Sequence, residues 1–152
     1  MMSISIEKAI VDDCELLAQI QKDSFDDESR TFNNEPGGPD GYDSKESQIE
    51  FMKHGHYYKI LKDSEIVGGV IVYVSNNFVY NLGRIYIDPK YQNRGIGHQV
   101  IKLIEAKYPE AQKWWLDTPN WSVSNHYFYE KSGYVKINEE NGLFIYEKCM
   151  RS

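Results

Sequence analysis

The chain has 152 residues, about the length of one domain, and a formal net charge of −6 at pH 7. This acidic balance argues against broad binding to phosphate backbones, so we expect no nucleic-acid partner. No stretch approaches the roughly 18 uninterrupted apolar residues of a membrane helix, and the first ten residues do not resemble a secretory signal. The sequence therefore predicts one domain over residues 1–152, with no membrane partner, in the cytoplasm.

The N-terminal third predicts one strand and two helices. Alternating apolar residues predict a strand over 3–9, and apolar residues at helical spacing predict a helix over about 12–25. Residues 26–44 are dense in Gly, Pro, Asn and Asp, which predicts a long loop that is functional or mobile. Ser44 is expected to cap a short helix that ends near Lys53.

The rest of the chain predicts six strands and two helices. Three strands lie in HYYKILKD, EIVGGVIVYVS and FVYNLGRIYID, joined by tight turns. A helix over 95–107, a strand in KWWLDT and a helix over 123–131 follow, with Ser122 as a candidate cap. A final hairpin turns at Asn141–Gly142. The order predicts a mixed α/β fold: a mostly antiparallel sheet of about seven strands, one right-handed crossover and about four helices.

Two glycines, in YQNRGIGHQV, mark the start of the third predicted helix. The first backbone amides of a helix have no acceptor within it, and glycine lets an anion approach them closely. A plain strand-to-helix turn explains the glycines equally well. A P-loop is excluded because His98 and Gln99 follow Gly97, and a dinucleotide motif is excluded because Val100 replaces the third glycine.

One pattern does match: Gln92–Gly97 fits Gln/Arg-x-x-Gly-x-Gly/Ala. Together with LGRIYIDPKYQNRGIG, the later segment NHYFYEKSGYVK and the element order, it makes the sequence resemble the GNAT superfamily of N-acetyltransferases. The resemblance covers nearly the whole chain and implies a single GNAT domain over 1–152. It also implies that the fourth and fifth strands splay apart.

The resemblance implies acetyl-CoA (coenzyme A) as co-substrate. Amides of the glycine turn would hold its pyrophosphate, the fourth strand would pair with its pantetheine arm, and an asparagine of the next helix would touch it. The implied cofactor-binding residues are Ile85, Tyr86, Ile87, Gln92, Asn93, Arg94, Gly95, Ile96, Gly97, His98 and Asn125.

Tyr129 matches the general-acid tyrosine of the family, which would protonate the departing thiolate. The alternative is a packed aromatic residue. Some histone-acetylating relatives carry a glutamate base on the fourth strand, where this chain has Asn81, so no base is assigned. Six acidic residues are candidates for a general base, although each also fits a surface charge or a turn position. They are Asp26, Asp27, Glu28, Asp40, Asp43 and Asp117.

The sequence thus predicts an N-acetyltransferase that moves an acetyl group to a primary amine of a small molecule or peptide, by direct attack in a ternary complex. The 26–44 loop is expected to select the acceptor. His54 and His56 lack a third ligand, so no metal is expected. One alternative is a non-catalytic acyl-CoA-binding module, favoured by Asn81 and opposed by Tyr129. A nucleotide-phosphate protein conflicts with the acidic charge. The resemblance also allows a homodimer.

Overall fold

The computed structural model describes residues 3–150. In this range the chain forms a seven-stranded sheet with four α-helices and two 3-10 helices. The elements, in chain order, are β1 (Ile4–Lys8), η1 (Val11–Asp13), α1 (Cys14–Asn33), α2 (Lys45–His54), β2 (His56–Lys62), β3 (Glu65–Tyr73), β4 (Val79–Ile87), η2 (Pro89–Tyr91), α3 (Ile96–Lys107), β5 (Lys113–Pro119), α4 (Val123–Lys131), β6 (Val135–Glu140) and β7 (Leu143–Cys149). The mixed α/β prediction is confirmed.

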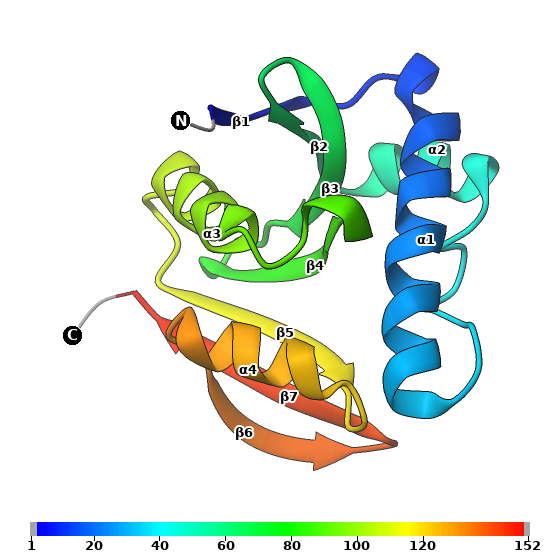
Figure 1. Ribbon diagram of the computed structural model, residues 1–152. Helices are drawn as coiled ribbons and strands as arrows, with labels where there is room; N and C mark the ends of the chain where they lie inside the picture. Colours follow the sequence, from blue (N-terminus) through cyan, green and yellow to red (C-terminus); the bar gives the residue numbers. More distant parts are fainter. Residues whose placement is uncertain (1–2, 151–152) are drawn as a thin grey trace.

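Helices cover both faces of the sheet, whose strand order is β1-β2-β3-β4-β5-β7-β6. One buried cluster joins Leu17 and Ile20 of α1 to Ile71 of β3. The other joins α3 and α4 to the opposite face, where Val70 of β3 is buried. In Figure 1, α3 lies within the curved β1–β4 half and α4 lies along β5 and β7. Consecutive residues of β3 therefore supply the two cores, as strand alternation requires.

The sheet opens in its middle. All neighbouring strands are antiparallel except β4 and β5, which run parallel and pair only over Val79–Asn81 and Lys113–Trp115. Asn81 is the last β4 residue of this short ladder, and its Nδ2 donates to the Trp115 carbonyl of β5 at 3.0 Å. The second half of β4 has no β5 partner, so the predicted splay is confirmed.

The first helix is longer than the sequence predicted. α1 runs to Asn33, so residues 26–33 are helical and the prediction that they form a loop is wrong. No glycine or proline occurs before Pro36, and the helix ends where Asn34 takes a left-handed φ of 67°. The true connection is the shorter segment 34–44.

Two expected caps behave differently. The Ser44 side chain accepts from the Ser47 amide at 3.1 Å, which confirms the predicted cap of α2. Ser122 makes no capping bond, and its hydroxyl donates instead to Glu28 of α1. Ser122 does occupy the predicted N-cap position of α4, but a carboxylate distant in the sequence takes its hydroxyl, so the side chain does not cap the helix.

A buried carboxylate holds the 34–44 segment against α1. Asp26 is 2% exposed and accepts from Lys22 Nζ at 2.6 Å and from the Tyr42 hydroxyl at 2.7 Å. Burial alone would raise the pKa of Asp26, but these two hydrogen bonds outweigh it and lower the pKa. The bond to Asp26, with burial, raises the pKa of Tyr42 to about 12.

Replacing Tyr42 with phenylalanine is expected to lower the free energy of unfolding by about 1–2 kcal/mol at neutral pH. Because folding raises the pKa of Tyr42 from 10.0 to about 12, its contribution is complete below pH 10 and is lost as pH rises toward 12. Urea unfolding at pH 7, 9, 10 and 11 measures the difference between the two proteins. Tyr127→Phe, at an exposed tyrosine, is the control and should show no such trend. A Tyr42 difference that stayed constant up to pH 11 would contradict the prediction.

No helix within residues 3–150 combines the length and apolar character needed to cross a membrane. Cys14 is buried, Cys149 is exposed, and both thiols are free.

Candidate active site

A cavity of about 290 Å³ lies beside the unpaired half of β4. It is bounded by the later turns of α1, the β4–α3 turn, the start of α3 and the inner side of α4. Its lining residues are Ser24, Phe25, Glu28, Ile85, Tyr86, Ile87, Tyr91, Gln92, Asn93, Gly95, Ile96, Gly97, His98, Ser124, Asn125, Tyr127, Phe128 and Tyr129.

The candidate acid Tyr129 and every residue that the resemblance implied for cofactor binding, except Arg94, line this cavity. The Arg94 guanidinium lies instead over the ring of Tyr91, 5.6 Å from its centroid. The fold therefore brings together segments of β4, the glycine turn and α4 whose lining residues are up to 44 positions apart in the sequence, from Ile85 to Tyr129.

The glycine turn presents free amides. Asn93 and Gly95 both have left-handed φ angles, of 63° and 78°. The first backbone bond of α3 runs from the Gln99 amide to the Gly95 carbonyl at 3.2 Å. The amides of Ile96, Gly97 and His98 thus have no acceptor inside the helix, which makes this end of α3 suited to an anion.

The two glycines of the turn serve different purposes. Gly95 needs its left-handed φ, and a Cβ there would meet open space. A Cβ on Gly97 would lie 2.7 Å from the ring of Phe128, so this glycine lets α3 pack closely against α4. Gln92 ties the turn to the sheet, because its Nε2 donates to the Ile87 carbonyl at 3.0 Å.

The free edge of β4 carries unpaired amides. The Asp88 amide donates to the Val67 carbonyl of β3 at 2.8 Å. Because backbone bonding alternates along an antiparallel pair, the amides of Ile85 and Ile87 are directed away from β3, toward the side where β5 has splayed off. An extended ligand could therefore pair with β4 as an added strand would.

Tyr129 is 8% exposed and packs against the rings of Phe128, Tyr134 and Tyr146. Burial raises its pKa well above the usual value, and the negative charges of Asp117 and Glu28 raise it further. Its hydroxyl has no hydrogen-bond partner within the described part of the chain. The tyrosine thus keeps its proton at neutral pH and faces the cavity with a free hydroxyl.

Glu28 belongs to the site, although the sequence placed it in a loop as a surface charge. It lines the cavity from α1, and its carboxylate accepts from the hydroxyls of Ser122 and Ser124, each at 2.5 Å. These bonds join α1 to the start of α4 across the open sheet. The sequence does hold a signal: Ser24, Phe25 and Glu28 share one face if the helix continues to residue 33.

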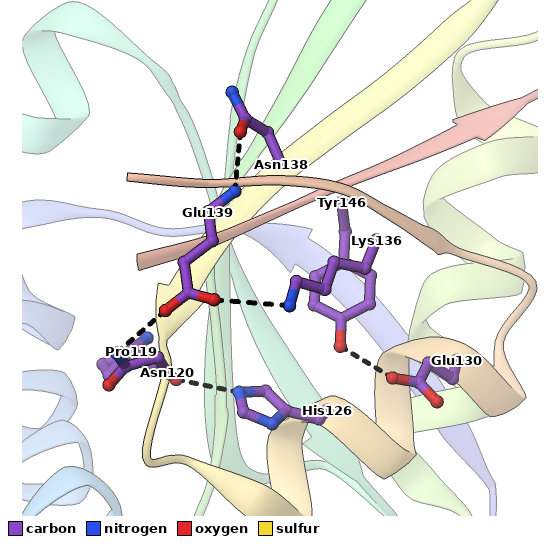
Figure 2. A network of polar contacts seen from close by, with 8 residues as sticks. All are labelled: Pro119, Asn120, His126, Glu130, Lys136, Asn138, Glu139 and Tyr146. Atoms are coloured by element: carbon purple, nitrogen blue, oxygen red, sulfur yellow. Dashed lines mark hydrogen bonds and ion pairs between the residues drawn. The ribbon is translucent and has the colours of Figure 1, made fainter. Parts of the chain in front are cut away.

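The opposite side of α4 is fixed by polar contacts with the C-terminal strands (Figure 2). His126 Nε2 bonds the Pro119 carbonyl at 2.8 Å, and its ring stacks on Phe144 with centroids 4.5 Å apart. The Tyr146 hydroxyl donates to Glu130 at 2.8 Å. His126 therefore holds α4 in place, and this anchoring turns Asn125 and Tyr129 toward the cavity.

The other acidic candidates lie elsewhere. Of the residues described, Asp27, Asp40 and Asp43 do not line the cavity, and Asp26 is buried in its own cluster rather than solvated as expected. Asp117 is exposed, yet partial desolvation raises its pKa, and its negative charge raises the pKa of Tyr129.

Neither His54 nor His56 takes part in a metal site. His54 lies 3.7 Å from Glu50, and the ring of His56 packs edge-on against Tyr108. Among residues 3–150, no group of three or more His, Cys, Asp or Glu side chains could hold a metal ion.

A family model described as the acetyltransferase (GNAT) family matches residues 17–134, which include every cavity-lining residue named above. The chain belongs to the GNAT acetyltransferase family. The resemblance drawn from the glycine turn and the Phe128–Lys131 segment is thereby confirmed.

The GNAT chain has a sequence relative in Bacillus subtilis (strain 168), the uncharacterized protein YrkN, which is 33% identical over 100 residues. The matched segment covers 65% of this chain and 54% of YrkN, so it spans about half of that relative.

Solved structures share the whole GNAT fold. The PaiA N-acetyltransferase from Thermoplasma acidophilum, in complex with coenzyme A, has a TM-score of 0.84 at 20% identity, covering 97% of this chain and 99% of that one. A GNAT family acetyltransferase from Elizabethkingia anophelis, with acetyl-CoA bound, has a TM-score of 0.65 at 21% identity, covering 97% and 98%. These likenesses confirm the expected fold.

Proposed function

We propose that this chain is an N-acetyltransferase that moves the acetyl group of acetyl-CoA to a primary amine of a small molecule or peptide, by direct attack in a ternary complex. One observation carries the proposal. A single cavity joins an anion-suited helix start, an unpaired strand edge and a protonated tyrosine hydroxyl. Two of the structural neighbours, PaiA and the Elizabethkingia anophelis protein, were crystallised with coenzyme A or acetyl-CoA, which supports the same co-substrate here.

Acetyl-CoA supplies an activated thioester, and this chain's residues would hold and polarise it. The amides of Ile96, Gly97 and His98 suit its pyrophosphate. The free edge of β4 suits the two amides of its pantetheine arm. The Ile87 amide, directed into the opening, would donate to the oxyanion that forms when the amine attacks. Tyr129 would give its proton to the departing thiolate.

The acceptor end of the cavity is acidic. Glu28 lines the cavity, and the negative charges of Glu28 and Asp117 both raise the pKa of Tyr129. Their negative potential would attract an amine, which is cationic in water before it loses a proton to react. Glu28 lies within residues 26–44, from which the sequence expected acceptor selection, and it would act from helix α1 rather than from a loop.

Titration of acetyl-CoA by calorimetry, with ATP and NAD as controls, tests the co-substrate. We expect saturable binding of acetyl-CoA at one site and none of the controls. Thiol release with polyamines, amino acids and N-terminal peptides then identifies the acceptor. Folded protein that did not bind acetyl-CoA would overturn the proposal. Binding without turnover on any amine would favour the acyl-CoA-binding module.

The remaining expectations belong to the same proposal. We propose a cytoplasmic location, with which the free thiols of Cys14 and Cys149 agree. A single domain over 1–152 is proposed, and a homodimer is allowed by the family. Light scattering of the purified chain measures its assembly.

A further inference from the structure

A second hollow, of about 330 Å³, lies beside the active-site cavity. It is formed by α3, the end of α4 and β7. Its lining residues are His98, Ile101, Lys102, Glu105, Lys131, Ser132 and Lys148. His98 lines both spaces, so the second hollow begins one side chain away from the amides of the glycine turn.

The hollow is positively charged, although the chain as a whole carries −6. Three lysines and one carboxylate line it. Glu105 accepts from Lys148 Nζ at 2.7 Å, and the Ser132 carbonyl accepts from the same nitrogen at 2.8 Å. The positive charge of Lys148 is therefore already balanced by Glu105. Lys102 and Lys131 make no ion pair with any carboxylate of residues 3–150. Lys131 Nζ donates to the hydroxyl of the exposed Tyr127 at 3.2 Å, a neutral partner that leaves its positive charge uncompensated.

The shared wall is rigidly held. His98 Nδ1 and the Ser132 hydroxyl lie 2.9 Å apart, and that hydroxyl donates to the Phe128 carbonyl at 2.9 Å. The His98 ring also packs on Phe128, with centroids 4.9 Å apart. A ligand seated on the glycine turn could thus extend past His98 into a hollow whose position relative to that turn is fixed.

We propose that Lys102 and Lys131 form a subsite for a phosphomonoester, and that this group is the ribose 3′-phosphate of coenzyme A. The inference rests on the proposed function, because it assumes that the pyrophosphate of the same molecule occupies the glycine turn. A phosphomonoester carries close to two negative charges at neutral pH, which matches two lysine point charges. The pyrophosphate would then bind at the start of α3, and the 3′-phosphate would bind between α3 and the end of α4.

Calorimetric binding of coenzyme A and 3′-dephospho-coenzyme A tests the subsite. The native chain is expected to bind coenzyme A about tenfold more tightly, the size of one charge-assisted contact. Lys102→Gln/Lys131→Gln should remove this preference and leave the affinity for dephospho-coenzyme A within about twofold. Lys107→Gln is the control, because it also removes a positive charge from α3 although Lys107 is not among the residues that line the hollow. The preference for coenzyme A over dephospho-coenzyme A should persist in this variant.

Three outcomes would overturn the subsite. One is a native chain that binds both ligands equally, and another is a double variant that keeps the preference. The third is lysine-dependent binding of inorganic phosphate without a preference for coenzyme A, which would assign the hollow to a separate phosphate ligand. Failure of the native chain to bind either form would instead overturn the proposed function, and the subsite with it.

Discussion

Replacing Tyr129 with phenylalanine is expected to lower kcat by about 10²–10⁴-fold, the usual contribution of a general acid. The ring packing against Phe128, Tyr134 and Tyr146 is retained, and the removed hydroxyl has no partner among the residues described. The Kd of acetyl-CoA should therefore change by less than about twofold. Thiol release measures the first quantity and calorimetry the second.

Tyr134→Phe is a matched control. Tyr134 is 3% exposed and packs edge-on against Tyr129, with ring centroids 6.0 Å apart. It is not among the residues that line the cavity. Burial raises its pKa as well, so a raised pKa alone does not mark the proposed acid. The control should keep kcat within about twofold. Full turnover by Tyr129→Phe would show that Tyr129 is only a packed aromatic residue, and the proposed acid would be wrong.

Gly68→Ala is expected to lower the free energy of unfolding by about 3 kcal/mol, at the upper end of the cost of overpacking. A Cβ at Gly68 would lie 2.1 Å from the carbonyl oxygen of Tyr86. Since that atom belongs to the backbone of β4, no side-chain rotation relieves the clash. The β3–β4 ladder must open instead, and this ladder is what directs the free amides of Ile85 and Ile87 into the cavity. Urea unfolding measures the loss.

Gly37→Ala provides the control for the loss of a glycine as such. Gly37 lies in the 34–44 segment, and the nearest atom to a Cβ there is Ser29 Oγ, at an ordinary 3.7 Å. Its effect should stay within about 0.5 kcal/mol. Equal stability of Gly68→Ala and the native chain would mean that β3 and β4 can separate at no cost. The alignment of the β4 edge would then need another explanation.

The sequence by itself determined the order of elements, the glycine turn and the candidate residues of β4 and α4. These features are local. Apolar alternation in EIVGGVIVYVS and helical spacing in residues 96–104 report burial over a few neighbouring positions. The left-handed φ angles of Asn141 and Gly142 follow from residue type in the same way. The Gln92–Gly97 motif, the Phe128–Lys131 segment and the element order together then indicated the family, because each can be recognised in contiguous sequence.

Only the tertiary structure decided what depends on contacts between distant segments. α1 continues through residues that read as a loop because burial against the rest of the fold stabilises Asp26 and Ser29 within the helix. Glu28 enters the cavity because Ser122 and Ser124, 94 and 96 residues away, bind its carboxylate. Gly97 must be small because of Phe128, which lies on another helix. A pattern within one segment cannot encode a neighbour that arrives only when the chain folds, so these parts of the site required the coordinates of both partners.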